Sequence, residues 1–144
     1  MRLGILGGTF DPIHYAHLVI AEECRVRLGL AGVIFIPAGE PPHKRRQSVT
    51  PAADRLAMVE LAIASNPAFR VSRVEIDRPG PSYSVDTIAA LQAELGPEAE
   101  LYFIVGQDAM ADILTWHEPR RLLALCRLVA IHRPGVREPD MAAL

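Results

Sequence analysis

The chain is poor in the residues that build metal sites, disulfides and large aromatic surfaces. Its 144 residues include only two cysteines and one tryptophan. Cys24 and Cys126 lie far apart in apolar stretches and form no metal-binding or redox spacing. Both are therefore predicted to be reduced core residues of a cytoplasmic protein.

The sequence also lacks long apolar runs and an excess of positive charge. Its apolar runs are four to six residues long, whereas a membrane-spanning helix needs about 20. The first run, RLGIL, is too short for a secretion signal and leads directly into Gly7 and Gly8. The formal net charge is −2, which argues against a non-specific nucleic-acid binder. We expect neither a membrane nor a nucleic acid as partner.

Short apolar runs alternate with amphipathic stretches, and this alternation is typical of a parallel sheet with helical crossovers. Half the residues are hydrophobic and 22% are charged, a globular composition. We predict one domain over residues 1–144, an open, mostly parallel, Rossmann-like α/β sheet with helices on both faces. The expected strands are 2–6, 32–37, 69–76, 101–106 and 127–132; the expected helices are 16–28, 51–63, 85–95 and 119–126. Thr50 is the predicted cap of the second helix and Ser84 of the third.

Four polar segments follow predicted strands and should meet at one edge of the sheet. Ligands of open α/β sheets bind beyond the carboxyl ends of the strands. The four segments are 7–17, 41–46, 106–108 and 132–133. The sequence therefore predicts a ligand site at this edge.

The stretch GILGGTFDPIHYAH, residues 4–17, carries the most specific chemistry. Gly7, Gly8 and Thr9 let the backbone approach a phosphate closely and offer bare N–H donors. Their spacing matches neither the G-x-G-x-x-G turn of dinucleotide-binding oxidoreductases nor a Walker loop. By themselves two glycines are equally compatible with an ordinary tight turn. Asp11 is expected to hold this turn or to cap the following helix.

Two histidines follow the glycine turn. His14 and His17, three apart at the start of a helix, project to the same side, where free N–H groups and the helix dipole already favour anions. Such a pair suits a triphosphate and its leaving pyrophosphate. The H-E-x-x-H zinc spacing is absent, so we predict no protein-held metal site.

These residues resemble a known superfamily. GGTFDPIHYAH looks like the GG-[ST]-F-D-P and H-x-G-H motifs of nucleotidyltransferases. Class I aminoacyl-tRNA synthetases carry a related histidine motif, but their length and second signature are not matched. Within the superfamily the chain resembles bacterial nicotinate-nucleotide adenylyltransferases, from Met1 to about Gly135. The further stretches that carry this resemblance are PPHK (41–44), DRLAM (54–58), RPGPSYSVDT (78–87), FIVGQD (103–108) and Trp116.

The resemblance implies transfer of the adenylyl group of ATP to nicotinate mononucleotide, giving nicotinate adenine dinucleotide and pyrophosphate in NAD biosynthesis. Mg²⁺ would accompany ATP, bound largely through phosphates and water. His14 and His17 would be catalytic. The implied ATP-binding residues are Gly7, Gly8, Thr9, Phe10, His14, His17, Gly106, Asp108 and Arg133. The implied acceptor-binding residues are His43, Lys44, Arg46, Tyr83, Ser84, Asp108 and Trp116.

The chain departs from the family pattern in two places. Ala16 replaces the usual glycine of H-x-G-H, and the family's I-S-x-[ST]-x-[IL]-R segment is absent, so the C-terminal part of the family fold is expected to be missing. The alternatives are an adenylyltransferase with nicotinamide mononucleotide or phosphopantetheine as acceptor, and a non-catalytic nucleotide-binding domain. A solvated charge run at 44–46 and a core role for Trp116 also stay open, as does a homo-oligomer.

Overall fold

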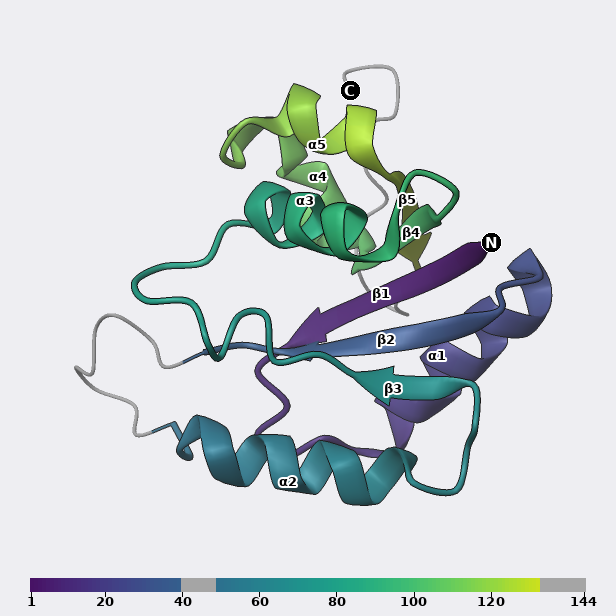
Figure 1. Ribbon diagram of the computed structural model, residues 1–144, viewed down its shortest axis with the longest axis vertical. Coiled ribbons are helices and arrows are strands. Elements are labelled where there is room, and N and C mark those ends of the chain that lie inside the picture. Colours follow the sequence, from purple (N-terminus) through teal and green to yellow (C-terminus); the bar gives the residue numbers. More distant parts are fainter. Residues whose placement is uncertain (40–48, 133–144) are drawn as a thin grey trace.

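The computed structural model describes residues 1–39 and 49–132, and these form a five-stranded, wholly parallel sheet with helices on both faces (Figure 1). The predicted fold class is confirmed. The strands are β1 (Arg2–Gly8), β2 (Gly32–Pro37), β3 (Phe69–Val71), β4 (Glu100–Gly106) and β5 (Arg127–Ile131). The helices are α1 (Tyr15–Leu28), α2 (Ala52–Ile63), α3 (Ser84–Leu95), α4 (Gln107–Ala111) and α5 (Pro119–Leu125), with a 3₁₀ turn, η1, at Ile113–Thr115.

The strand order is β3-β2-β1-β4-β5, so β1 lies at the centre of the sheet. β1 pairs with β2 from Leu3↔Gly32 to Gly8↔Pro37, and with β4 on its other side. The chain reverses its direction of winding between β3 and β4, which places a topological switch point between β1 and β4. The glycine turn that ends β1 therefore lies beside the crevice in which such sheets bind ligands.

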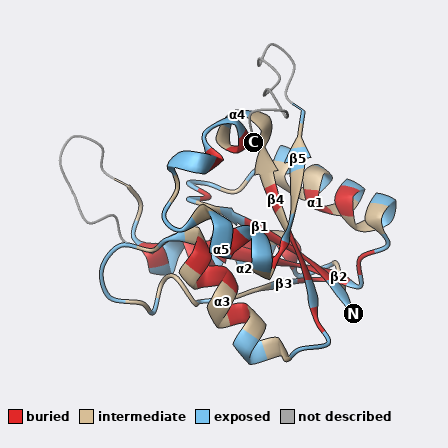
Figure 2. Cartoon of the chain, turned by 90° about the horizontal axis from the view of Figure 1, so that it is seen from above, coloured by how far each residue is buried: buried red, intermediate tan, exposed pale blue. Residues whose placement is uncertain are grey.

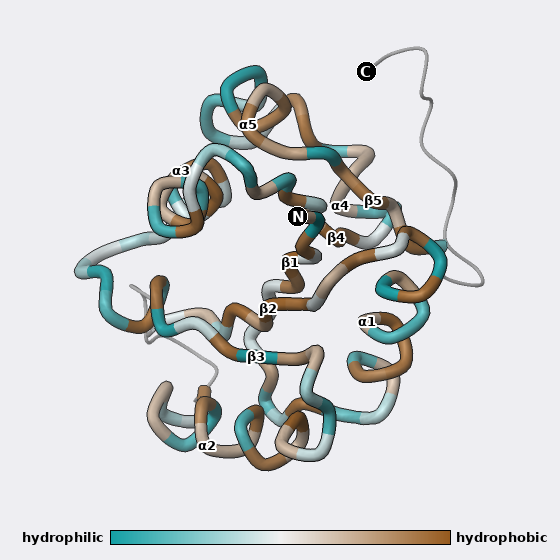
Figure 3. The backbone as a smooth tube through the Cα atoms, turned by 45° about the vertical axis from the view of Figure 1, so that its right-hand side comes forward, coloured by the Kyte–Doolittle hydropathy of each residue, from teal (hydrophilic) through white to brown (hydrophobic). Residues whose placement is uncertain are grey.

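Helices cover both faces of the sheet, and each face has its own apolar core (Figure 3). α1 and α2 pack on one face, where Cys24, Val59 and Phe35 belong to one buried cluster. α3 and α5 pack on the other, with Ile88 and Leu122 in a second cluster. Every residue of β2 is buried, as an unbroken apolar run predicts for a strand covered on both sides (Figure 2).

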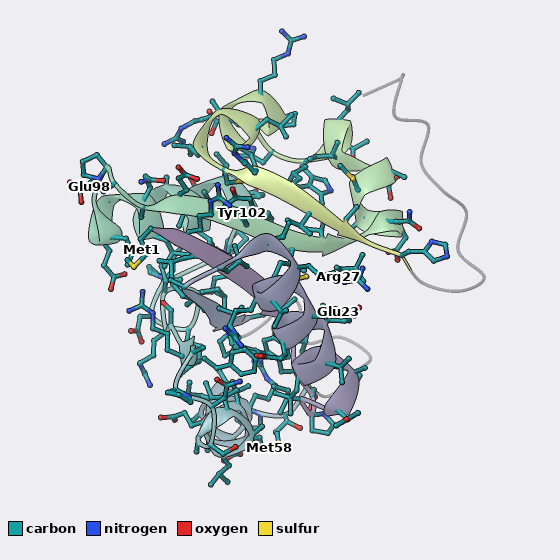
Figure 4. All side chains as sticks on the ribbon, turned by 90° about the vertical axis from the view of Figure 1, so that its right-hand side faces the viewer. Met1, Glu23, Arg27, Met58, Glu98 and Tyr102 are labelled. Atoms are coloured by element: carbon teal, nitrogen blue, oxygen red, sulfur yellow. The ribbon has the colours of Figure 1, made fainter. Side chains whose placement is uncertain are left out.

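α1 shows how local sequence sets the limits of an element. It ends at Gly29, whose φ of 62° is the left-handed conformation that glycine adopts without strain. On its exposed side Glu23 and Arg27 form an ion pair of 2.7 Å one turn apart (Figure 4). The predicted start at residue 16 is one residue late.

The predicted third strand was too long. Only Phe69–Val71 pairs with β2, over Val33↔Phe69 to Phe35↔Val71. The Ser72 N–H still donates to the Phe35 carbonyl, but the Val74 N–H is taken by the Ser72 hydroxyl. This local bond turns the chain out of the ladder. Residues 72–76 therefore lie outside the strand, with a turn at 74–76.

Two predicted caps were also wrong. Pro51 is the N-cap of α2, with Thr50 outside the helix, and Tyr83 is the N-cap of α3, which makes Ser84 its first residue. The short helix α4 and the turn η1 were not predicted, because segments of five and three residues carry no usable periodicity.

No helix among the described residues is long and apolar enough to cross a membrane. Both cysteines are buried and unpaired, so the predicted reduced core residues are confirmed. Cys126 donates its S–H to the Leu122 carbonyl, and burial raises its pKa to about 11. Burial also raises the pKa of Cys24.

Both thiols are expected to resist modification in the folded protein. The thiolate is the reactive form, and a raised pKa keeps each group protonated at about pH 8. A chromogenic disulfide reagent should titrate neither cysteine in native protein and both in denaturant. Rapid labelling of native protein at that pH would contradict this burial.

Candidate active site at the carboxyl edge of the sheet

A cavity of about 500 Å³ opens at the carboxyl edge of β1 and β4, where the sequence predicts a ligand site. This volume lies within the usual range for small-molecule sites. The loop after β1 and the start of α3 supply walls from opposite faces of the sheet. Of the predicted site residues, the cavity is lined by Gly7, Gly8, Thr9, His17, Ser84 and Gly106.

The glycine turn is shaped by Phe10. Phe10 is buried at 3% exposure with a φ of 50°, which is unusual for a side chain of this size. Its ring lies against Gly8, where an added Cβ would be only 3.2 Å from it. The same ring meets the edge of His17, with 5.0 Å between ring centroids. Phe10 therefore supports the turn and His17 from below, and only its backbone is available to a ligand.

His14 and His17 lie together, as their spacing predicts. His14 is the N-cap of α1, and its backbone N–H donates to Nδ1 of His17 at 3.1 Å. The ring centroids are 4.0 Å apart. Because Nδ1 accepts this bond, the neutral ring of His17 carries its proton on Nε2, an assignment made from the hydrogen bond. His17 lines the cavity, whereas His14 is exposed.

Arg55 lies in the DRLAM stretch that carries the resemblance, but no role was predicted for it. Its side chain is fully buried, with 0% exposure. It donates to three loops: to the Thr9 carbonyl after β1 at 2.8 Å, to the Ala38 carbonyl after β2 at 2.8 Å, and to the Thr50 carbonyl before α2 at 2.8 Å. A fourth bond reaches the Gly39 carbonyl at 3.2 Å. The available signal was a charged residue beside Leu56 on the apolar face of α2.

Asp11 also bonds to Thr50, whose carbonyl accepts from Arg55. Its Oδ2 accepts the Thr50 N–H at 2.9 Å, which joins the loop after β1 to the residue before α2. The Thr50 hydrogen bonds lower the pKa of the Asp11 carboxyl, with a smaller contribution from Arg55. Asp11 does hold the turn, as expected, but through a residue 39 positions away.

Glu75 and Thr87 form a polar cluster on the cavity wall. Thr87 ends the RPGPSYSVDT stretch, but neither residue was predicted to belong to the site. The Thr87 hydroxyl donates to Oε2 of Glu75 at 2.8 Å and accepts from the Arg78 guanidinium at 3.1 Å. Burial raises the pKa of the Glu75 carboxyl, against smaller lowering effects of the Thr87 bond and of Arg78. The segment stays close to β2 because Gly39 leaves room: a Cβ there would lie 2.5 Å from the Glu75 carbonyl oxygen.

The predicted aromatic residues lie beside the cavity and do not line it. Tyr83 stacks on His117 at 4.3 Å between ring centroids. Trp116 packs edge-on against Phe103 at 6.3 Å, and Phe103 does line the cavity. Asp108 is exposed in α4, which His132 joins to the end of β5 through a 2.8 Å contact with Gln107. His43, Lys44, Arg46 and Arg133 lie outside the described residues.

The fold and the site together define a nucleotide-binding α/β domain. A model of the cytidylyltransferase-like family matches residues 5–143, which is nearly the whole chain, and the chain belongs to this family. The predicted resemblance to nucleotidyltransferases is confirmed at the level of the family.

Curated relatives narrow the comparison within the family. The chain is 57% identical over 134 residues to a Moorella thermoacetica protein named "Probable nicotinate-nucleotide adenylyltransferase". A protein of the same name from Dehalococcoides mccartyi is 49% identical over 144 residues. The alignment with the Moorella relative covers 93% of this chain but only 62% of that relative. The alignment with the Dehalococcoides relative covers 100% of this chain and 71% of that relative.

A solved structure shows the same fold at low identity. The Plasmodium falciparum nicotinic acid mononucleotide adenylyltransferase complexed with NaAD superposes with a TM-score of 0.71 at 19% identity. The alignment covers 94% of this chain and 77% of that chain. At this identity the likeness shows the nucleotidyltransferase fold.

Replacing Arg55 by alanine is expected to destabilise the protein by about 2–4 kcal/mol, because four carbonyl oxygens lose a charged donor. Lysine should rescue little, because one compact ammonium cannot span three loops. The free energy of unfolding in urea measures both effects. Arg120→Ala, on the exposed side of α5, is the matched control and should stay within about 0.5 kcal/mol. Equal losses for the two alanine variants would contradict a special role for Arg55.

Proposed function

We propose that the protein transfers the adenylyl group of ATP to nicotinate mononucleotide, giving nicotinate adenine dinucleotide and pyrophosphate. The observation that carries the proposal is the cavity at the carboxyl edge of the sheet, with His17 of α1 on one wall and Ser84 of α3 on the other. These walls suit a polyanion on one side and a second anionic group on the other. Relatives about half identical to the chain bear the name of this activity.

The ATP half of the site would lie against α1. The backbone of Gly7, Gly8, Thr9 and Phe10 offers a close approach for phosphates, next to the N-terminus of α1. His17 accepts the His14 N–H at Nδ1, which leaves Nε2 as a donor suited to oxygens that gain charge as pyrophosphate leaves. His14 would assist on the same side. Gly106, Asp108 and Arg133 would hold the adenosine.

The acceptor half would lie against α3. In the first turn of α3, N–H groups of Asp86 and Thr87 bond back to Tyr83, while Ser84 lines the cavity. The Asp86 and Thr87 donors are occupied, so the carboxylate of nicotinate would be received by N–H groups at Ser84, where α3 begins. Tyr83 and Trp116 would flank the pyridine ring, and His43, Lys44 and Arg46 would hold the acceptor phosphate.

The chemistry requires little from the protein beyond positioning and charge stabilisation. An oxygen of the acceptor phosphate attacks the α-phosphorus of ATP in line, the bond to the bridging oxygen breaks, and pyrophosphate leaves with the electron pair. The attacking phosphate is already anionic, so no protein base is needed. We treat Mg²⁺ as part of the substrate Mg–ATP. Among the described residues there is no group of three or more His, Cys, Asp or Glu side chains that could hold a metal ion.

Pyrophosphate release with Mg–ATP tests the proposal directly. Nicotinate mononucleotide should support release, and nicotinamide mononucleotide and phosphopantetheine should not. Release with one of the other two acceptors would instead assign that acceptor. Binding of ATP without release for any acceptor would favour a non-catalytic nucleotide-binding domain.

The substitution His17→Asn tests the donor role of Nε2 separately from the hydrogen bond that Nδ1 accepts. Asparagine can still accept the His14 N–H, but it does not reach the position of Nε2. We expect kcat to fall by roughly 10²–10³, the usual loss for one charge-stabilising donor, with KM for the acceptor little changed. Thermal unfolding should match that of the parent protein. Unchanged kcat would remove His17 from the proposed mechanism.

A further inference from the structure

Glu75 places a negative charge on the acceptor side of the cavity, where the proposed chemistry gives it no task. Its segment leaves the sheet after β3, and its side chain lines the cavity together with Thr87 of α3. Apart from Asp108, the charged residues predicted for the acceptor site are basic, to match a phosphate and a carboxylate. An anion on this wall therefore needs its own explanation.

The hydrogen bonding leaves one oxygen of Glu75 available. The Thr87 hydroxyl donates to Oε2 at 2.8 Å, and within residues 1–39 and 49–132 no other donor bonds to the carboxylate. Among these described residues no buried side-chain oxygen lacks a partner, so Oε1 is accessible rather than buried, and Glu75 is one of the residues that line the cavity.

No described cation neutralises Glu75 directly. The Arg78 guanidinium donates to the Thr87 hydroxyl at 3.1 Å, and among the described residues it forms no ion pair with the carboxylate, which its charge affects only through space. Burial raises the pKa of Glu75, as expected for a carboxylate that lacks a cationic partner in contact. Holding the Thr87 hydroxyl requires only a neutral acceptor, such as a glutamine amide. The charge itself is costly unless a ligand uses it.

A ligand with both charges would fit this wall. Ser84 begins α3 and Thr87 stands about one turn further on, roughly 5 Å along the axis. The wall thus presents a helix N-terminus, which favours an anion, beside a carboxylate, which favours a cation. A nicotinate ring joined to ribose through its nitrogen is a zwitterion: its carboxylate is negative and its ring is a pyridinium cation.

We propose that Glu75 is a specificity-determining residue of the acceptor site, whose carboxylate receives the cationic pyridinium ring while the first turn of α3 receives the ring's carboxylate. The inference rests on the proposed function, since it takes a nicotinate nucleotide as the acceptor. It extends that function because the site would then discriminate between acceptors by the charge of their ring as well as by their carboxylate.

Two isosteric fragments isolate the ring charge. N-methylnicotinate carries the pyridinium cation and the carboxylate, and 3-methylbenzoate has the same shape with a neutral ring. Each is measured as a competitor of nicotinate mononucleotide binding to the parent protein and to Glu75→Gln. Glutamine can still accept the Thr87 hydroxyl, so the cluster that holds the loop is retained.

The parent protein should bind N-methylnicotinate roughly tenfold more tightly than 3-methylbenzoate, the ratio that corresponds to one pKa unit of charge interaction. In Glu75→Gln this ratio should fall to about one. Glu60→Gln removes the same charge from an exposed position on α2 and should leave the ratio unchanged. If Glu75→Gln does not fold, Glu75→Asp, which keeps the charge, should still prefer the cationic fragment.

A merely structural Glu75 would weaken both fragments equally and leave their ratio intact. That result, or a ratio of about one in the parent protein, or failure of both fragments to compete, overturns the inference and leaves the proposed function standing as long as nicotinate mononucleotide binds. If nicotinate mononucleotide itself does not bind to the parent protein, the proposed function fails, and the inference fails with it.

Discussion

The arrangement of the site depends on one buried guanidinium. Arg55 donates to carbonyl oxygens in the loops after β1 and β2 and in the segment before α2. A charge without contact to water is tolerated only when its donors are satisfied, and here four carbonyl oxygens accept from it. These segments are adjacent to β1, β2 and α2. Because Arg55 bonds to all of them, it holds the glycine turn after β1 at a defined position beside the neighbouring strand.

The position of the glycine turn also determines the orientation of the His17 ring. Phe10 packs beneath Gly8 and against the ring of His17, and the His14 N–H orients that ring through Nδ1. The donor edge of His17 is thus supported by packing on one side and by a backbone bond on the other. Groups held in this way need little reorganisation when charge develops near them, which is the property that transition-state stabilisation requires.

The walls of the cavity differ in charge, and this difference comes from the two faces of the sheet. α1 brings its N-terminus and His17 from one face, and α3 brings its N-terminus from the other with Glu75 beside it. The family assignment accounts for the first wall through the glycine and histidine motifs. Arg78 and Thr87 lie in the RPGPSYSVDT stretch, but that motif does not show that Thr87 bonds to Glu75, which lies outside it.

The core strands and the pair of imidazoles follow from local sequence patterns. β2 is an unbroken apolar run that only a doubly covered strand can bury, and His14 and His17 are close because they share one helical turn. The end of β3, the hydrogen bonds of Arg55 and the contact of Glu75 with Thr87 depend instead on how the chain packs in three dimensions. Arg55 meets Thr9 across 46 positions, and Glu75 meets Thr87 across 12. Helical and strand periodicity act over a few residues along the chain. The contacts of Arg55 and Glu75 span many more residues and exist only after the sheet has brought distant loops together.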